Sequence, residues 1–372
     1  MNLEKHQESV ETLICPATKL GLKLLTLARA EEQVNGKFYP RADSLNAKGK
    51  VSKAAGPTEW VLLREDLKCA YPVVEGIPIL LAPEALTVGG DQKSFDLTDP
   101  RYAEAYEEMD FYNNEASDVV GTLERHGVDA ILSPTSDEER ASFPAPWYRW
   151  VDTVYDSAAL WDAYIHLGET KNRRFLQLGG KGTHLVKFAL AGAAESWLVT
   201  PMLGEAKFGR ELAGLAGVGG DFRCVVGIAE ELPIRSETFD AIFAGGCLHH
   251  MQTDLALPEA ARVLRKGGRF AAVEPWRAPL YAIGTKILGK REDAYCTPLT
   301  AKRVDAMRTG FSSSELIQHG TMTRYAFLAL SKLGINVNKY IPWYVGKIDD
   351  AVCSVIPGMR KMGSSIAVLG KK

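Results

Sequence analysis

Two groups of residues in this sequence have types and spacing suited to chemistry on a small molecule. The first is the run "FLQLGGKGTHL" at 175–185, where Gly179, Gly180 and Gly182 separate an apolar stretch from a helix-forming one. Glycines at a strand–helix junction let the backbone approach a ligand closely, and the N–H groups at the start of the helix can bind a polar group. A glycine-rich turn is also common as a simple tight turn, so its meaning depends on the surrounding elements.

The second group is the histidine pair His249 and His250 in "GGCLHHMQ", together with Glu274 in "VEPWRAP". An imidazole with an ordinary pKa near ~6.5 can accept the proton that a hydroxyl or amine acceptor loses during a displacement reaction. Glu274 is the other candidate catalytic residue, expected to bind substrate. The alternative is that one of the histidines only caps or packs the segment after the strand.

The elements that must position these residues repeat regularly from 173 onward. Apolar strands alternate with amphipathic helices, and each strand is nearly continuous in hydrophobic residues. This pattern predicts an α/β domain with a doubly wound, mostly parallel sheet covered on both faces. Its ligand should bind at the carboxyl ends of the strands, beside the glycine turn. The segments 315–334 and 364–372 are expected to add a further helix and a final edge strand.

Three blocks of this sequence carry a resemblance to a known family: "FLQLGGKGTHLVKFALAGA", "GIAEELPIRSETFDAIFAGGCLHHM" and "LPEAARVLRKGGRFAAVEPW". Together they resemble class I S-adenosylmethionine-dependent methyltransferases of the small-molecule branch, over about 173–278. The resemblance implies a seven-stranded Rossmann-like fold and S-adenosylmethionine as cofactor. It also implies methyl transfer, and our first hypothesis for the acceptor is an oxygen or nitrogen of a small molecule or glycan precursor.

The acidic residues that anchor the cofactor in that family are replaced here. Gln177, Thr200 and Ile228 stand where carboxylates face the methionine, ribose and adenine parts, respectively. Because a hydrogen bond to a charged acceptor contributes roughly 1.5–3 kcal/mol, cofactor binding is weakened unless Glu205 or Glu230 substitutes. The lost acids favour an alternative function, a non-catalytic or repurposed member that acts as a binding or assembly module. The resemblance implies the following cofactor-contacting residues: Gln177, Gly179, Gly180, Gly182, Thr200, Ala229, Glu230 and Gly246.

The composition divides the chain into three regions. Residues 1–95 read as a small β-rich domain with turn signals, 96–170 as a helical linker or lid, and 171–372 as the Rossmann-like domain with a substrate-side insertion near 278–340. Large aromatic and apolar residues recur at helical spacing over 147–164. We interpret them as one face of a helix packed on the next domain, with a lid over the active site as the alternative.

Within the first region, "ICPATK" and "CAYPVVEGIPILL" resemble the small domain of the tRNA-methyltransferase activator family. Zinc-binding members hold four cysteines, whereas here Thr18 replaces one member of the first pair and Cys69 does not match the second pair. Two thiols cannot complete a tetrahedral site, so we predict no metal. The segment "GIPILL", 76–81, is expected to add a strand to a neighbouring surface or to cover the substrate cleft.

Bulk properties restrict the partners. The 372 residues carry a formal charge of −2, with no basic stripe, so a nucleic acid is not the expected substrate. The sequence shows no secretory signal and no apolar run of membrane-spanning length, and its six cysteines are dispersed. We therefore expect a cytoplasmic methyltransferase acting on a small-molecule substrate, with oligomerisation left open.

Overall fold

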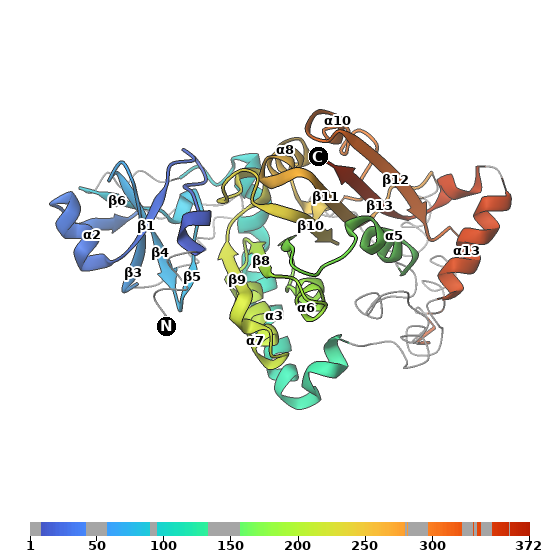
Figure 1. Ribbon diagram of the computed structural model, residues 1–372, viewed down its shortest axis with the longest axis horizontal. Helices are drawn as coiled ribbons and strands as arrows, with labels where there is room; N and C mark the ends of the chain where they lie inside the picture. The colour runs from blue at the N-terminus through green and yellow to red at the C-terminus, as the bar shows by residue number, and fades with distance from the viewer. Residues whose placement is uncertain are drawn as a thin grey trace.

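The computed structural model describes residues 9–41, 58–89, 95–132, 157–279, 281, 297–321, 330, 333–335, 344–356 and 358–372. Two β-sheets dominate these residues: a small one near the amino terminus and a large one that follows it (Figure 1). About half of the predicted insertion at 278–340, and the aromatic run up to 156, lie outside the described residues. No helix in the described part of the chain is long and apolar enough to cross a membrane.

The amino-terminal sheet is antiparallel, with the order β1-β3-β4-β6-β2 and β5 paired to β4. A short helix, α2, follows β1 and ends at Asn35, which adopts the left-handed conformation at φ 49°. Apolar side chains of α2 and of one face of the sheet, such as Leu25, Val61 and Leu63, form a small separate core. The elements are β1 (Leu22–Thr26), α2 (Leu27–Val34), β2 (Phe38–Pro40), β3 (Trp60–Arg64), β4 (Cys69–Val74), β5 (Ile77–Pro78), η1 (Ala82–Glu84) and β6 (Leu86–Val88).

The large sheet has seven strands in the order β12-β13-β11-β10-β7-β8-β9. Five neighbouring strands, β11 to β9 in that order, run parallel, and only β13 runs antiparallel to its neighbours. This confirms the predicted mostly parallel, seven-stranded Rossmann-like sheet with a separate mostly-β region before it. The strands are β7 (Arg174–Leu178), β8 (Glu195–Thr200), β9 (Phe222–Val226), β10 (Phe239–Gly245), β11 (Leu264–Pro275), β12 (Ser313–His319) and β13 (Ser365–Lys371).

Helices cover both faces of the large sheet, because side chains alternate along each buried strand. On one face α3, α5, α6 and α7 contribute to a core that includes Tyr106, Leu160, Phe188 and Phe243. On the other face α8 and α10 pack with residues of the amino-terminal region in a second core. The remaining elements are α3 (Pro100–Leu132), α5 (Ser157–Leu167), α6 (Thr183–Leu190), α7 (Leu203–Leu215), η3 (Gly219–Asp221), η4 (Ala229–Glu231), η5 (Leu248–His250), α8 (Thr253–Val263), α10 (Met307–Gly310), α13 (Tyr344–Val355) and η6 (Met359–Met362).

The carboxyl-terminal part departs from the prediction. Residues 315–319, expected to begin a helix, belong to strand β12, and β13, expected at the edge, lies inside the sheet between β12 and β11. Residues 313–316 of β12 are exposed, so this strand has little of the hydrophobic pattern that identifies a buried strand. Its backbone pairing with β13 decides its structure instead.

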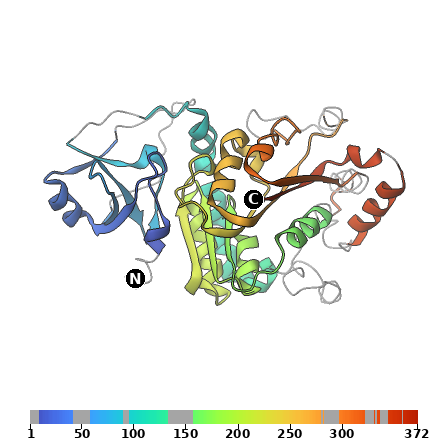
Figure 2. The same ribbon diagram turned by 45° about the horizontal axis from the view of Figure 1, so that its top comes forward.

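The amino-terminal region joins the large sheet at the free side of β9. Ile79 forms a parallel bridge to Val226, and the Leu80 N–H donates to the Val226 carbonyl at 2.7 Å. Figures 1 and 2 both show the blue amino-terminal sheet beside β9. This contact agrees with the expectation that the segment 76–81 adds a strand to a neighbouring surface.

Candidate functional site

The glycine turn connects β7 to α6 at the carboxyl edge of the large sheet. Gly179 has φ 70°, and a Cβ atom there would lie 2.9 Å from Cys247 Sγ, so a larger residue would push the loop after β10 away. Gly182 has φ 78°, and its Cβ would lie 3.1 Å from Leu198 Cδ2. Gly179 therefore permits close packing of two loops at the site, whereas Gly182 permits close packing of α6 beneath it.

The Gln177 side chain stabilises this turn through two hydrogen bonds. Its Nε2 donates to the Gly179 carbonyl at 2.9 Å, and its Oε1 accepts from the Leu185 N–H at 2.9 Å. The side chain is buried. A carboxylate could accept from Leu185 but could not donate to Gly179, so the amide suits this position better than the acid that the family resemblance led us to expect.

At the end of β8, Thr200 is paired with an acid from the next helix. The Thr200 hydroxyl donates to Glu205 Oε2 at 2.6 Å, and Thr200 Oγ1 accepts from the Met202 N–H at 3.3 Å. Glu205 lies in the first turn of α7, where the helix dipole favours a negative charge. Burial raises the pKa of its carboxyl group. A buried carboxylate from α7 thus lies directly beside the end of β8.

A second buried acid, Glu230, lies in η4, the short turn after β9. Its Oε1 accepts from the Gln252 N–H at 2.7 Å, and burial raises the pKa of the carboxyl group to about 7. Ala229 precedes it in the same turn. Gly246, with φ 65°, directly follows β10 and donates its N–H to the Val273 carbonyl at 2.9 Å.

His249 and Glu274 form a buried pair that contacts the loop after β10. Glu274 Oε1 accepts from the N–H groups of Cys247 at 3.0 Å and Leu248 at 2.8 Å. Its Oε2 lies 2.7 Å from His249 Nδ1. The Glu274 carboxylate thus holds this loop in place and is not among the residues that line the cavity described below.

His250, by contrast, points toward helix α3. Its Nδ1 lies 2.6 Å from Glu104 Oε1 and 3.3 Å from Glu108 Oε2. The ring of Tyr112 packs edge-on at 6.3 Å between centroids. The ligand atoms of the two carboxylates and the imidazole lie within 4.8 Å of one another, so these described residues have the spacing to hold a metal ion, as well as to bond to one another.

These groups meet around a cavity of about 140 Å³ at the carboxyl ends of β7, β8 and β10. The structure brings most of the predicted site residues together on its wall and leaves four outside it. The predicted residues that line it are Gly179, Gly180, Thr200, Ala229, Glu230, Gly246 and His250. Those that do not are Gln177, Gly182, His249 and Glu274.

The outer wall of the cavity comes from α3, which sequence reasoning had treated only as part of a linker or lid. Arg101, Glu104, Glu108 and Tyr112 all line the cavity. Their spacing of three and four residues places them on one face of the helix. This spacing is the sequence feature from which their shared position could have been predicted. An ion pair from Arg101 and a 2.6 Å hydrogen bond from Tyr102 to Glu231 fasten the start of α3 to η4.

Comparison with known proteins identifies part of this region. Residues 176–272 match the family described as methyltransferase domain. The ubiquinone/menaquinone biosynthesis C-methyltransferase UbiE of Idiomarina loihiensis is 36% identical over 99 residues, which are 26% of this chain and 39% of that protein. This chain therefore spans less than half the length of that curated relative.

Two solved geranyl diphosphate methyltransferase structures are similar to this chain. The geranyl diphosphate C-methyltransferase of Streptomyces coelicolor, in complex with Mg²⁺, geranyl diphosphate and S-adenosyl-L-homocysteine, is 14% identical. The alignment covers 72% of this chain and 98% of that one, with a TM-score of 0.44. A geranyl diphosphate methyltransferase in complex with S-adenosylmethionine is 16% identical, with 64% and 95% covered and a TM-score of 0.41. The family match shows that residues 176–272 are similar to a methyltransferase domain.

Proposed function

We propose that this chain, which carries a methyltransferase domain at 176–272, binds S-adenosylmethionine and methylates a small molecule. The cavity at the carboxyl ends of β7, β8 and β10 supports the proposal, because the glycine turn, a buried carboxylate and an imidazole meet there. The carboxylate, Glu205, carries the proposal, since it offers the charged acceptor that position 200 lacks.

The residues on the cavity wall fit the cofactor in kind. Glu205 is proposed to accept hydrogen bonds from the ribose hydroxyls, with the Thr200 hydroxyl holding its orientation at 2.6 Å. Gly179 and Gly180 offer backbone to the methionine portion, and the apolar side chains of Ile228 and Met251 suit the adenine ring. The proposed cofactor contacts thus include backbone groups of the glycine turn and one carboxylate, Glu205, which comes from α7 and not from the end of β8.

The cavity is small for such a ligand, because small-molecule sites usually enclose roughly 300–1,000 Å³. Its outer wall is α3, held by the contact of Glu104 with His250 at 2.6 Å. We therefore propose that α3 moves outward when the cofactor enters and closes over it afterwards. The role of α3 is then that of the lid considered for 96–170.

The proposed chemistry needs one base from the protein. The cofactor, when bound, supplies an electrophilic methyl group, and an oxygen or nitrogen acceptor loses a proton as the new bond forms. With the Nδ1 proton of His250 donated to Glu104, the basic lone pair of the imidazole lies on Nε2. His250 is thus the proposed base, and His249 and Glu274 position the loop that carries it.

The proposal also covers the amino-terminal region, the location of the protein and the competing function. The region before residue 96 is proposed to be an activator-like module without zinc, since Thr18 replaces one ligand of the related motif and Cys15 bonds to Tyr71 Oη at 3.2 Å. No metal is required by the proposed reaction, and the cytoplasm is the proposed location. The competing function is a binding or assembly module that retains the fold without catalysis.

Calorimetric titration with S-adenosylmethionine and S-adenosylhomocysteine tests cofactor binding. We expect the Glu205→Gln variant to bind about 10- to 100-fold more weakly than the wild type, because hydrogen bonds to a charged acceptor contribute roughly 1.5–3 kcal/mol. Glu211→Gln, on an exposed position of the same helix, should bind as the wild type does. Absence of heat from the wild type at high protein concentration would favour the binding-module alternative.

The base is tested with the methyl-labelled cofactor and a pool of hydroxyl- and amine-bearing small molecules. We expect the wild type to label one class of compound and His250→Gln to lose about 10²- to 10⁴-fold in rate while cofactor affinity stays within a few-fold. The labelled product also identifies the atom methylated. An unchanged rate in His250→Gln would exclude this residue as the base.

A further inference from the structure

Two cysteines of the amino-terminal region, Cys15 and Cys69, lie in contact, and the proposed methyl transfer uses neither of them. Both are buried free thiols in the same apolar core. The Cys69 thiol is hydrogen-bonded to Cys15, although the two residues lie far apart in the sequence. Two thiols cannot complete a tetrahedral metal site, but two adjacent thiols are sufficient for a disulfide.

The pairing of β3 with β4 brings other groups to the same two sulfur atoms. In the antiparallel register of these strands, Arg64 stands opposite Cys69. Tyr71 lies on the same face of β4 as Cys69, because side chains alternate along a strand. Both neighbours contact Cys15: its Sγ lies 3.2 Å from Tyr71 Oη and 3.7 Å from Arg64 Nη1. One face of the small sheet thus surrounds the Cys15 sulfur with two hydrogen-bonding groups and a cation.

The cation is held in this position by an acid. Arg64 Nε and Nη2 donate to the Asp66 carboxylate at 2.7 and 2.9 Å, while Nη1 donates to Cys15 Sγ. A guanidinium group beside a thiol favours the thiolate, which is the nucleophilic form. Hydrogen bonds from the Cys69 thiol and from neighbouring hydroxyl groups lower the pKa of Cys15, against the opposing effect of burial. Cys15 therefore has the surroundings of a reactive cysteine, with a second thiol beside it.

Burial restricts the oxidants that can reach this pair. Cys15 is 0% exposed and Cys69 is 6% exposed. A bulky disulfide such as oxidised glutathione must place its own sulfur against the attacking thiolate, and the packed core leaves no room for it. Hydrogen peroxide is little larger than water, so a small local opening of the fold admits it.

We propose that Cys15, activated by Arg64, and Cys69 are the site of a disulfide formed by a peroxide. The Cys15 thiolate attacks one peroxide oxygen, the O–O bond breaks, and the leaving hydroxide takes up a proton to become water. The Cys69 sulfur then attacks the sulfenic acid on Cys15 and loses its proton, the S–O bond breaks, and a second water leaves. Two thiols are thus oxidised by two electrons, and one peroxide is reduced to two waters.

The new bond connects the two parts of the fold. Cys15 closely follows Leu13, which bridges Ile234 of the larger α/β region, and Cys69 begins β4 of the small sheet. A groove of about 840 Å³ lies between these parts, and Leu13 is one of its lining residues. The disulfide therefore ties the segment that contacts the α/β region to the small sheet.

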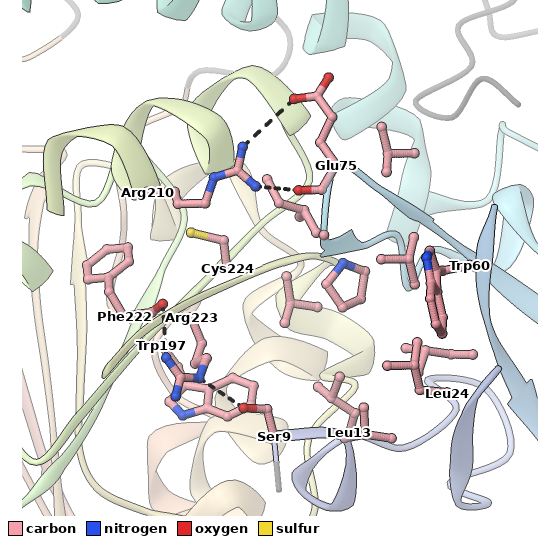
Figure 3. A pocket seen from close by; sticks show the side chains of 18 of the residues that line it. Ser9, Leu13, Leu24, Trp60, Glu75, Trp197, Arg210, Phe222, Arg223 and Cys224 are labelled. Carbon is pink, nitrogen blue, oxygen red and sulfur yellow. Dashed lines mark hydrogen bonds and ion pairs between the residues drawn. The ribbon is translucent and has the colours of Figure 1, made fainter. Parts of the chain in front are cut away.

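The same groove contains a cysteine that serves as an internal control. Cys224 lies on its large-sheet wall, across from Trp60 of the amino-terminal sheet (Figure 3). Burial raises the pKa of the Cys224 thiol to about 12. Because this residue stays a thiol at neutral pH, we expect it to react slowly with the same oxidant.

The test treats the full chain with hydrogen peroxide, alkylates the remaining thiols, and digests the product without reductant for mass spectrometry. We expect a linked pair of peptides that contain Cys15 and Cys69 and are lighter than their sum by two hydrogens. The pair should form at least about tenfold faster than Cys224 is oxidised. Oxidised glutathione at the same concentration should form it at least about tenfold more slowly than the peroxide does.

Variants then separate the roles of the three groups. In Cys69→Ser the sulfenic acid on Cys15 has no thiol to react with, so dimedone should label Cys15 there and not in the wild type. Arg64→Gln should slow the cross-link about tenfold, whereas Arg29→Gln, at an exposed position of α2, should not change it.

Three results would overturn the proposal. The first is that both thiols remain alkylated at peroxide concentrations that oxidise Cys224. The second is that Cys15 bonds to a different cysteine, or is oxidised to a sulfinic acid while Cys69 stays free. The third is that Arg64→Gln and the wild type form the cross-link at the same rate.

Discussion

At the scale of single residues, two polar side chains occupy positions where carboxylates were expected, and they differ in what compensates for the change. Gln177 both donates to and accepts from the glycine turn, which an ionised acid could not do. Thr200 instead recruits Glu205, five residues along the chain, at 2.6 Å. The site therefore has a buried carboxylate, Glu205, beside Thr200, and a glycine turn held by the Gln177 amide.

Glu230 provides a prediction about pH. Its pKa is raised by burial from 4.5 to about 7, so between these pH values the folded protein binds a proton that the unfolded chain has released. Stability contributed by this site is therefore lost as pH rises through that window. Glu230→Gln keeps an oxygen for the Gln252 N–H and removes the charge. Urea unfolding should show the variant gaining roughly 2–3 kcal/mol over the wild type between pH 4.5 and pH 8.

Glu211→Gln is the control for the pH series, because its side chain is exposed. Its unfolding free energy should follow that of the wild type at every pH. A constant difference between Glu230→Gln and the wild type across the range would mean that this carboxyl group titrates normally, and the raised pKa would then be wrong.

At the scale of elements, the glycine turn needs glycine for two reasons: a left-handed backbone, and close packing that leaves no space for a Cβ atom. Two variants can separate these reasons. Gly182 and Gly217 have nearly the same φ, 78° and 76°. A Cβ on Gly182 would lie 3.1 Å from Leu198 Cδ2 and 3.5 Å from Gly209 Cα, whereas a Cβ on Gly217 would contact nothing within 4 Å. Comparing alanine substitutions at the two glycines therefore separates the cost of close packing among α6, α7 and β8 from the cost of the left-handed backbone.

We expect Gly217→Ala to lose about 1–2 kcal/mol, the cost of a left-handed backbone for a residue with a Cβ. Gly182→Ala should lose about 1–3 kcal/mol more, because the added methyl group must displace packed neighbours. Chemical denaturation of the two variants measures both values. Equal losses would show that α6 can shift without cost, and that the close approach at Gly182 has no energetic importance.

At the scale of the whole molecule, the two sheets share one hydrophobic core. Leu80, from the segment that joins β9, is buried together with Trp197 and Val225 of the large sheet and Tyr71 of the small one. A contact of this kind couples the stability of the two regions. The amino-terminal region is thus part of the folded unit that contains the site.

Leu80→Ala should therefore destabilise both sheets, by about 2–5 kcal/mol as for other buried leucines. Native-state hydrogen exchange should show the amides of β3 and β8 losing protection by similar amounts. Leu215→Ala, at an exposed position of α7, should change neither strand. Loss of protection confined to β3 would show instead that the amino-terminal region unfolds independently of the large sheet.

The sequence alone was sufficient for the parallel sheet and for much of the cavity wall. Each of the strands β7 to β10, and the second half of β11, is a short apolar run bounded by turn residues, and the glycine turn follows the first of them. These signals are local, because hydrophobic periodicity depends only on neighbours along the chain. They place Gly179, Thr200, Glu230 and His250 at the same edge of the sheet before any coordinates are known.

Only the tertiary structure decided which side chains face that cavity and what closes it. Glu104 meets His250 across 146 positions of sequence, and Glu274 meets His249 across 25. The strand β12 also depends on a tertiary contact, because its exposed residues form a strand only through pairing with β13. Contacts between distant residues depend on how the elements pack, and the period of a single element carries no information about its partner.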